Sequence, residues 1–362
     1  MAIWKIDELG EFVTLKRGYD LPQQKRKNGE IPIFSSSGVT GTHNEAMVEA
    51  PGVITGRYGT IGEVFFAETS FWPLNTTLYV ENFHENDEKF VYYFLKTLEW
   101  NKFASASAVP GINRNTVHKE IVRFPDFETQ QKIASVLSTI DKKIAVNKAI
   151  NDNLEQQAAA LFSSLYNRSN TEVRYTDLIQ ILGGGTPKTG ETAYWNGNIA
   201  FFTPKDVGTP YTFITEKTIT EEGLSHCNSR LYPVNTVFVT ARGTVGKVGL
   251  SGIPMAMNQS CYALVGKETH QLLVYFYTLK AVDRLKHKAS GAVFDAITTR
   301  DFDSEQIMKL SDDDAKAFLC VAEPMFQEML NNSIENLRLS TLRDFLLPKL
   351  MSGEIDVSSV QL

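Results

Sequence analysis

A long stripe of apolar positions occurs twice along this chain. Steps of alternately four and three residues from Ile133 to Leu165 reach mostly apolar side chains, and the same steps from Phe318 to Leu350 do so again. This is the spacing of a helix that keeps one stripe facing a partner helix. The stripes consist of Ile133, Leu137, Ile140, Ile144, Asn147, Asn151, Leu154, Ala158, Leu161 and Leu165, and of Phe318, Ala322, Met325, Met329, Asn332, Asn336, Leu339, Arg343, Leu346 and Leu350. The pattern predicts two long helices.

Both stripes carry a pair of polar residues at the same two positions. Asn147 and Asn151 recur as Asn332 and Asn336, 185 residues further on. A seam asparagine fixes register and partner choice at some cost in stability. If the helices pair antiparallel about a pseudo-two-fold axis, Asn147 faces Asn336 and Asn151 faces Asn332. These asparagines could instead face solvent, but their recurrence at both positions favours pairing.

The beginnings and the irregularities of the two helices can also be predicted. Asp126 and Ser311 lie 185 residues apart, and both are good N-cap residues. Pro324 removes a backbone donor inside the second helix, which predicts a kink or a break there. Arg343 replaces Ala158 on the stripe, which predicts that this position lies near the edge of the helix pair.

The segment before each helix mixes short strands with helical patterns. In the first copy, β-type runs at Val53–Ile54, Glu63–Phe66 and Thr77–Val80 precede a helical pattern from Glu88 to Phe103. The second copy repeats this order, which indicates a tandem duplication. The fold class predicted is therefore α/β (α+β) globular domains in two copies, joined by two long antiparallel coiled-coil helices. The boundaries expected are 1–125 and 169–310 for the globular domains, 126–168 and 311–352 for the helices, and 353–362 for a tail.

A turn rich in glycine recurs within the duplicated segment. Ile54–Val64 matches Val239–Val248 if Tyr58 is treated as an insertion, and this alignment places Arg57 opposite Arg242. Glycines let the backbone approach another surface closely, and arginine can bind a phosphate or read guanine in a bidentate manner. A plain structural turn, in which the arginine pairs with a nearby carboxylate, is the alternative. The recurrence in both copies favours a binding site.

Composition narrows the class of protein. Of the 362 residues, 43% are hydrophobic and 22% charged, which is ordinary for a soluble globular protein. There is no run of eighteen apolar residues, so we expect no membrane span. Three cysteines without zinc-ligand spacing fit a reducing cytoplasm. The net charge of −6 argues against a free-standing nucleic-acid binder driven by charge alone.

Signatures of catalysis are missing from the sequence. The glycine-rich run 183–190 lacks the Gly-Lys-Ser/Thr ending of a phosphate loop, and Pro187 stands where a backbone donor would be needed. The six histidines show no metal-ligand spacing. We therefore expect a non-catalytic chain that holds no metal and no cofactor of its own.

Three sequence segments carry a resemblance to a known family. They are Trp4–Gly10, Phe124–Ala134 and the closing run Leu342–Ile355. Together with the duplication, they make the chain resemble the specificity subunit of type I restriction–modification systems over essentially its whole length. The resemblance implies that each globular domain is a target recognition domain for one half of a bipartite DNA target. It also implies that the helices set the spacer and dock two modification subunits.

The resemblance further implies partners and cofactors. The partners are double-stranded DNA, two modification (methyltransferase) subunits and the restriction (motor/nuclease) subunits, with no membrane. S-adenosylmethionine, ATP and magnesium would act on those partner subunits. Two alternatives remain open at this point, namely a structural coiled-coil adaptor without DNA readout of its own and the specificity part of a related type II restriction–modification enzyme. A fused catalytic polypeptide is disfavoured by the missing methyl-donor and nuclease motifs.

Basic and polar residues in the two globular domains are the candidates for DNA contact. In the first domain they are Lys16, Arg17, Lys25, Arg26, Lys27, Ser36, Thr40, Arg57, Tyr58, Thr60, Asn75, Asn113 and Arg114. In the second domain they are Lys188, Thr189, Lys205, Arg242, Thr244, Asn258, Gln259, Thr299 and Arg300. These residue types contact phosphates and base edges.

Overall fold

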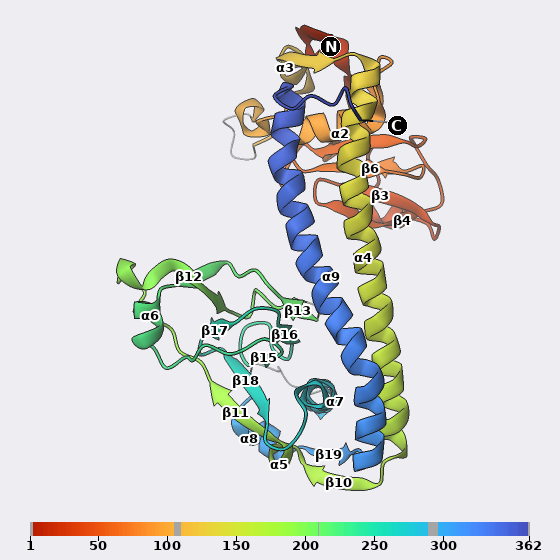
Figure 1. Cartoon of the computed structure of the whole chain (residues 1–362). Helices are drawn as coiled ribbons and strands as arrows, with labels where there is room; N and C mark the ends of the chain where they lie inside the picture. Colours follow the sequence, from red (N-terminus) through yellow and green to blue (C-terminus); the bar gives the residue numbers. More distant parts are fainter. Residues whose placement is uncertain (1–2, 105–109, 209, 289–295, 361–362) are drawn as a thin grey trace. The chain divides into compact units, whose positions relative to one another are not determined.

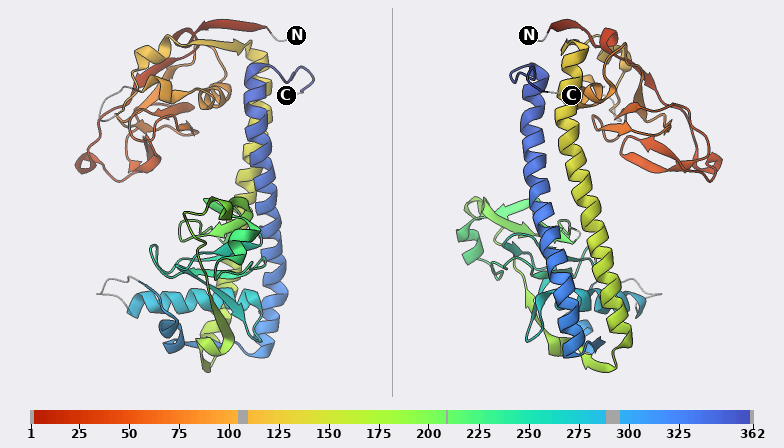
Figure 2. Two further views of the ribbon diagram at one scale, coloured as in Figure 1. Left: turned by 90° about the vertical axis from the view of Figure 1, so that its left-hand side faces the viewer. Right: turned by 45° about the vertical axis from the view of Figure 1, so that its right-hand side comes forward.

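The computed structural model divides the chain into two compact units (Figure 1). The first unit comprises residues 1–145 and 336–362, and the second comprises residues 146–335. The structure describes residues 3–104, 110–208, 210–288 and 296–360. Each unit combines one mixed α/β domain with a stretch of each of two long helices, as Figure 2 also shows. No described helix has both the length and the apolar character that crossing a bilayer requires.

The two long helices are α4 (Phe127–Arg168) and α9 (Asp312–Ser352). Both begin at the predicted N-caps, because the Thr129 amide donates to Asp126 Oδ1 at 3.0 Å and the Asp314 amide to Ser311 Oγ at 3.1 Å. All twenty stripe positions are buried or half-buried. The predicted pair of long helices is therefore confirmed.

Asparagine side chains set the register of the helix pair in the second unit. Asn332 Nδ2 donates to Asn151 Oδ1 at 3.0 Å, and Asn151 Nδ2 donates to the Met329 carbonyl and to Ser333 Oγ, both at 3.2 Å. The expected antiparallel contact between Asn151 and Asn332 is thus confirmed. Asn147 is fully buried and donates to Glu335 Oε2 at 2.6 Å. Asn336 is half-buried, and its contact with Asn147 stays a prediction.

Of the kink or break expected at Pro324, the break is wrong and the kink stays a prediction. Helix α9 continues through this residue without interruption. Proline removes one backbone hydrogen bond, whose acceptor would be the carbonyl of Cys320. Both Pro324 and Cys320 lie on the exposed side of α9, where water can satisfy that carbonyl. The packing of the opposite face, with Ala322 and Phe326 buried, keeps the helix intact.

The first unit contains two small sheets and a terminal ribbon. A four-stranded antiparallel sheet has the order β2 (Thr14–Arg17), β8 (Thr77–Asn82), β5 (Gly52–Gly56), β6 (Val64–Ala67). A three-stranded sheet has the order β4 (Gly38–His43), β3 (Ile31–Ser35), β7 (Trp72–Pro73). The ribbon pairs β1 (Trp4–Glu8) with β9 (Ile121–Pro125). The shorter helical segments of the first unit are α1 (Leu9–Phe12), η1 (Gln23–Lys25), α2 (Glu88–Lys96), η2 (Trp100–Phe103) and α3 (Arg114–His118). The three predicted strands are present as β5, β6 and β8.

Helix α2 is shorter than predicted. The pattern from Glu88 to Phe103 predicts one helix, but α2 ends at Lys96 and η2 follows after a turn. The indole of Trp100 donates to the carbonyl of Leu95 at 2.8 Å, and Thr97 Oγ1 donates to the carbonyl of Phe94 at 2.8 Å. These two bonds satisfy carbonyls at the helix end that a longer helix would have used. Sequence periodicity persists across the turn because Trp100 and Phe103 are still buried.

The second unit repeats this architecture. A five-stranded sheet has the order β11 (Ile179–Gly183), β18 (Cys261–Gly266), β15 (Val237–Thr240), β16 (Val248–Ser251), β13 (Tyr211–Thr212). A three-stranded sheet has the order β14 (Lys217–Ile219), β12 (Trp195–Phe202), β17 (Met255–Met257), and the ribbon pairs β10 (Thr171–Arg174) with β19 (Gln306–Lys309). The remaining helical segments are α5 (Tyr175–Leu178), η3 (Thr192–Tyr194), α6 (Glu221–Ser225), α7 (Gln271–Lys288) and α8 (Thr299–Ser304). The predicted duplication is therefore present in the topology.

In each unit an aromatic cluster continues from the domain onto the long helices. In the first unit, Ile133 and Leu137 of α4 and Leu350 of α9 belong to the same core as Phe12 and Phe90. In the second unit, the ring of Phe276 on α7 lies 5.0 Å from that of Phe162 on α4, 5.2 Å from Phe318 on α9 and 5.7 Å from Phe326 on α9. Each domain is thus anchored on its own stretch of the helix pair.

The Asn151–Asn332 contact gives a prediction for stability. Replacing Asn151 with leucine leaves the buried Asn332 amide without its acceptor, which costs about 1–3 kcal/mol. The double variant Asn151→Leu/Asn332→Leu removes both polar groups and should be close to neutral or more stable. Denaturant unfolding of the full chain measures both. Equal destabilisation by the single and the double variant would contradict a paired role for these residues.

His118 gives a prediction for the pH dependence of stability. Its Nε2 accepts the Leu15 amide at 2.8 Å, so the ring is neutral in the native state. Burial, with the charges of Arg114 and His84, lowers the pKa of His118 below its usual 6.5. The unfolded chain therefore takes up a proton first as the pH falls below about 6.5, and the native state loses stability there. The thermal midpoint should fall less steeply with acid in His118→Gln, whereas a variant of the exposed His287 should match the parent chain.

Candidate nucleic-acid interface

The glycine-rich turn of the first unit follows strand β5. The amides of Arg57 and Tyr58 both donate to the carbonyl of Thr76, at 2.9 and 3.3 Å. The amide of Ile112 donates to the carbonyl of Arg57 at 3.1 Å. These bonds bring three separate stretches of sequence together, namely the turn, the start of β8 and the segment before α3.

The second unit has the same bonds in the turn that follows β15. The amides of Ala241 and Arg242 donate to the carbonyl of Ser260 at 2.8 and 3.2 Å, and the amide of Ile297 donates to the carbonyl of Ala241 at 2.9 Å. The role of Arg57 is therefore taken by Ala241, and the role of Tyr58 by Arg242. The sequence alignment that treats Tyr58 as an insertion and sets Arg57 opposite Arg242 is wrong by one residue.

The glycines of the two turns agree with the corrected alignment. Gly59 and Gly243 have φ of 74° and 80°, and Gly62 and Gly246 have φ of 85° and 73°. Both pairs are related by the same shift of 184 residues, so the two turns have equal length. A positive φ strains residues that carry a side chain, which is why glycine stands at both positions in both copies.

The two arginines consequently have different surroundings. Arg57 is half-buried, its Nε donates to the carbonyl of Ile112 at 3.1 Å, and its guanidinium lies 4.5 Å above the ring of Tyr58. Arg242 is exposed, and its side chain has no hydrogen bond or ion pair to any residue that the structure describes. Arg57 therefore supports the turn from within, whereas the guanidinium of Arg242 is available to a ligand.

A groove of about 420 Å³ lies beside Arg242 in the second unit. It brings together four of the predicted DNA-contact residues from three separate segments, namely Lys205, Arg242, Thr244 and Asn258. Lys217 on β14 also lines it, with its ammonium 5.6 Å from the centre of the Trp195 ring. The sequence analysis missed Lys217, because a single lysine in a short strand has no signal that separates it from a solvated surface residue.

The remaining candidates of the second unit lie around this groove or apart from it. Gln259 accepts a hydrogen bond from Thr186, next to Asn258 in sequence. Lys188 and Thr189 are exposed in the loop before β12. Thr299 and Arg300 are exposed in the first turn of α8. They follow in sequence shortly after Ile297, whose amide donates to the carbonyl of Ala241 in the glycine-rich turn.

Several basic candidates of the first unit have carboxylate partners. Lys16 pairs with Glu81 at 2.5 Å, and Arg17 lies 3.9 Å from Asp20, which also accepts a hydrogen bond from Asn75. These exposed pairs are worth little for stability and can exchange a carboxylate for a phosphate. They nevertheless reduce the positive potential that the sequence alone suggests.

Other candidates of the first unit form two groups. Near the turn, Ser36 lies beside Gly56 and Gly59, and Thr60 is exposed. Asn113 caps α3 through a 3.0 Å bond from the Asn115 amide, and Arg114 is exposed at the first residue of that helix. The second group lies at β4, where Arg26 Nη1 donates to the carbonyl of Thr40 at 3.5 Å and the neighbouring Lys25 and Lys27 are exposed.

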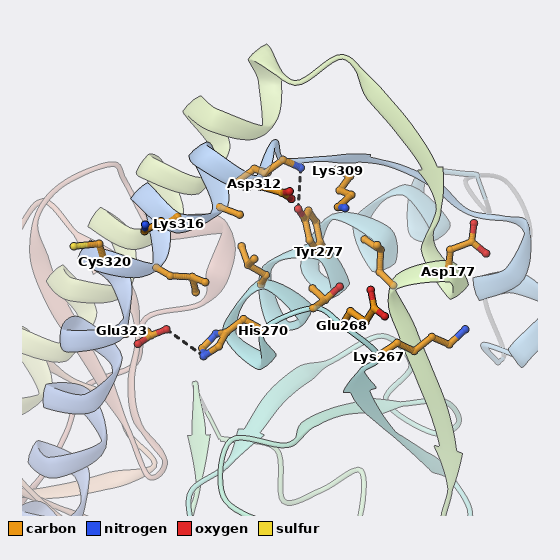
Figure 3. A pocket seen from close by; sticks show the side chains of 16 residues that line it. Asp177, Lys267, Glu268, His270, Tyr277, Lys309, Asp312, Lys316, Cys320 and Glu323 are labelled. Atoms are coloured by element: carbon orange, nitrogen blue, oxygen red, sulfur yellow. Dashed lines mark hydrogen bonds and ion pairs between the residues drawn. The ribbon is translucent and has the colours of Figure 1, made fainter.

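A further cavity lies elsewhere in the second unit and is lined by none of these candidates. It measures about 950 Å³ and lies between α7, the loop before it and the first turns of α9, where His270 pairs with Glu323 at 3.1 Å (Figure 3). In the first unit, three of the equivalent positions carry larger side chains. Phe90, Phe124 and Gln130 of that unit correspond to Leu273, Lys309 and Ala315 in the lining of this cavity.

A protein-family comparison gives the geometry its context. A model described as the type I restriction modification DNA specificity domain matches residues 1–156 and 167–309. The chain belongs to this family. The two matched segments contain the two mixed domains. The resemblance to the specificity subunit of type I restriction–modification systems is therefore confirmed. The specificity family's role is the recognition of DNA sequence.

Individual relatives agree with the family. The chain is 25% identical over 345 residues to the type I restriction enzyme HindI specificity subunit of Haemophilus influenzae, covering 72% of this chain and 75% of that protein. It is 32% identical over 124 residues to the MjaIX specificity subunit of Methanocaldococcus jannaschii, covering 33% of this chain and 29% of that protein. The crystal structure of a type I restriction-modification system S subunit from M. genitalium shares the fold, with a TM-score of 0.65, 17% identity and 96% of both chains covered.

The different surroundings of the two arginines give a prediction for DNA binding by the specificity chain. Arg242→Ala should weaken binding by about 1–3 kcal/mol if the guanidinium contacts a base, with the fold unchanged. Arg57→Ala should instead lower the thermal midpoint, because the bond to the Ile112 carbonyl and the stack on Tyr58 are lost. Anisotropy titrations at several salt concentrations, beside thermal melts, separate the two effects. Equal losses of DNA affinity at equal stability would show that the exposure of Arg242 is irrelevant.

Proposed function

We propose that this chain is the DNA-reading subunit of a restriction–modification complex and that each of its two mixed domains reads one half of a bipartite DNA target. The observation that carries this proposal is the duplication of a DNA specificity domain within one chain. Two copies with the same turn topology but different exposed side chains can recognise two different half-sites. Four predicted contact residues around the Arg242 groove support such a role for the second domain.

The long helices would hold the two half-site readers at a defined separation. Helix α4 is 42 residues long and α9 is 41 residues long. At about 1.5 Å per residue each spans roughly 60 Å. The Asn151–Asn332 contact fixes the register of the two helices. A fixed register would in turn fix the distance between the two half-site readers.

Catalysis in this proposal belongs to partner subunits. Two modification subunits would dock on the helices and use S-adenosylmethionine, and the restriction subunits would use ATP and magnesium. The net charge of −6 supports a role for the partners in DNA binding as well. Neutralisation of phosphates supplies much of the affinity for DNA, and the partners would provide the cationic surface that this chain lacks. The complex would work in the cytoplasm, where its DNA is.

The role of the helices as a spacer is testable by lengthening both. One heptad inserted after Ala149 and another after Ile334 keep the seam in phase, because seven residues restore the same helix face. Each helix grows by roughly 10 Å, which corresponds to about three base pairs at about 3.4 Å per base pair. Mapping of methylated sites should find the same half-sites with a spacer longer by about that amount.

The matched control inserts the heptad after Ala149 only. This leaves the asparagines of α4 and α9 out of register and should abolish methylation or destabilise the chain. A doubly lengthened variant that methylates the original target with its original spacer would refute the spacer role of the helices. Loss of all methylation at unchanged thermal stability would do the same, unless DNA binding to a longer spacer persists in a direct binding assay.

A further inference from the structure

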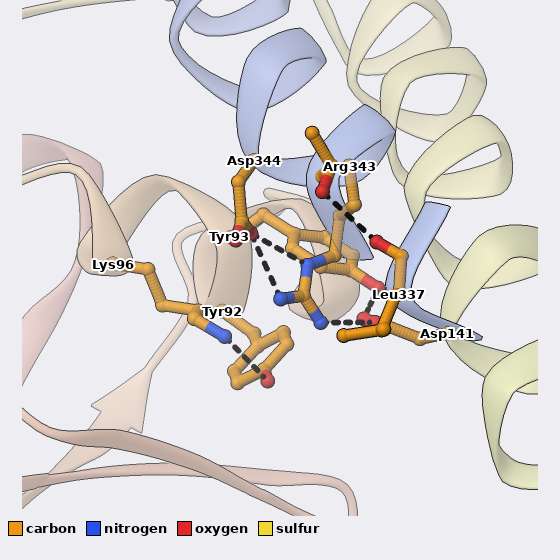
Figure 4. A network of polar contacts seen from close by, with 8 residues as sticks. Tyr92, Tyr93, Lys96, Asp141, Leu337, Arg343 and Asp344 are labelled. Carbon is orange, nitrogen blue, oxygen red and sulfur yellow. Dashed lines mark hydrogen bonds and ion pairs between the residues drawn. The ribbon is translucent and has the colours of Figure 1, made fainter. Parts of the chain in front are cut away.

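A charged network joins the first domain to both long helices within the first unit. Asp141 on α4 accepts two hydrogen bonds, one from the hydroxyl of Tyr93 on α2 at 2.6 Å and one from Nη1 of Arg343 on α9 at 2.8 Å (Figure 4). Arg343 also donates to Asp344 Oδ1 through Nε at 2.9 Å and Nη2 at 2.8 Å. A single carboxylate therefore connects α2, α4 and α9.

The members of this network are shielded from water to different degrees. Tyr93 is 2% exposed, and the side chains of Arg343 and Asp141 are 24% and 29% exposed. Burial and the hydrogen bond to Asp141 raise the pKa of Tyr93 well above its usual value, so its hydroxyl remains a donor at all physiological pH values. Hydrogen bonds to a partly buried carboxylate are strong and depend on direction.

The second copy has uncharged residues at the three equivalent positions. By the shift that relates α2 to α7, Tyr93 corresponds to Phe276, and by the shift of the helix stripes, Asp141 corresponds to Phe326 and Arg343 to Ala158. Phe276 and Phe326 are 2% and 4% exposed and lie 5.7 Å apart, and Ala158 is fully buried. Tyr275 donates to Glu155 at 3.1 Å nearby, but no described ion pair crosses between the helices at this position.

This difference between the copies has a mechanical consequence. Apolar packing is nondirectional, and its free energy depends mainly on the area removed from water. Hydrogen bonds between charged groups fix distances and angles in addition. Loss of one member of the first network also leaves a partly buried charge without its partner, which favours movement of the domain towards an arrangement that hydrates that charge.

We propose that Tyr93, Asp141 and Arg343 are positioning residues that fix the first recognition domain on the helix pair and thereby narrow the range of DNA spacers that the complex accepts. This inference rests on the proposed function, since a spacer requirement exists only if two half-sites are read together. At the three equivalent positions the second domain would be fixed by the packing of Phe276, Phe326 and Ala158, with no ion pair between the helices among the described residues. Disruption of the network would therefore broaden spacer preference without changing the half-site sequences.

The test uses the complex assembled with its modification subunits and a series of DNAs that keep both half-sites and vary the spacer by one or two base pairs. The readout is the ratio of methylation rates on the preferred and the neighbouring spacers. Loss of active protein cancels in this ratio, so a merely stabilising role would leave it unchanged. For Asp141→Asn we expect the ratio to fall by about tenfold, the effect of losing roughly one charge-assisted hydrogen bond.

Three further variants make the test specific. Tyr93→Phe removes only one hydroxyl, keeps the ring packing and should lower the ratio in the same direction, which keeps the test decisive if Asp141→Asn folds poorly. The triple variant Tyr93→Phe/Asp141→Phe/Arg343→Ala carries the residues of the second copy and should restore a narrow preference. Lys96→Ala is the matched control, because Lys96 lies on the same helix but outside the network: among the described residues its Nζ bonds the hydroxyl of Tyr92, at 3.2 Å.

The outcomes separate this inference from the proposed function. A parent complex without any spacer preference would refute the proposed function. A parent complex with a sharp preference, retained in both Asp141→Asn and Tyr93→Phe, would refute the positioning role and leave the proposed function intact. An equal broadening by Lys96→Ala would also refute it, because any change on α2 would then have the same effect.

Discussion

The hydrogen bond between Asn151 and Asn332 is the contact on which the rest of the architecture depends. Helix stripes made only of Leu, Ile and Met could slide by a heptad and still bury apolar surface. A buried asparagine has to meet a polar group, so only one register satisfies both amides. That register determines which stretch of α9 lies against which stretch of α4, and thus which helix residues each domain contacts.

Much of this framework could be predicted from the sequence because it follows from periodicity and capping. The apolar stripes, the recurrent asparagines and the N-caps Asp126 and Ser311 each depend on residues that are close in sequence. The break predicted at Pro324 does not occur, because packing on the buried face of α9 outweighs one hydrogen bond lost on the exposed face. The end of α2 at Lys96 was equally hidden, because buried side chains continue the same period beyond it.

The candidate site was harder to predict than the fold. Residue identity favours aligning Arg57 with Arg242. The strand pairing instead aligns Thr55 with Val239 and leaves no insertion. A one-residue shift in a strand or a turn sends side chains to the opposite face. It separates an arginine that supports its own turn from one that faces a groove. Residue type and recurrence alone cannot distinguish these two roles, because the decisive acceptor, the carbonyl of Ile112, lies 55 residues away in sequence.

The two copies therefore share a backbone plan and differ in the chemistry attached to it. Phe90, Phe124 and Gln130 are buried in the first unit, at positions where the second unit has Leu273, Lys309 and Ala315 along a cavity. Charge fixes the first domain on its helices at the place where phenylalanine and alanine fix the second. Such divergence is expected when a duplicated domain must keep its attachment but read a different sequence. The common constraint is the set of main-chain hydrogen bonds that both turns make, to the carbonyl of Thr76 in the first copy and to that of Ser260 in the second. Because these shared bonds involve no side-chain atoms, they leave the exposed side chains of the turn free to change.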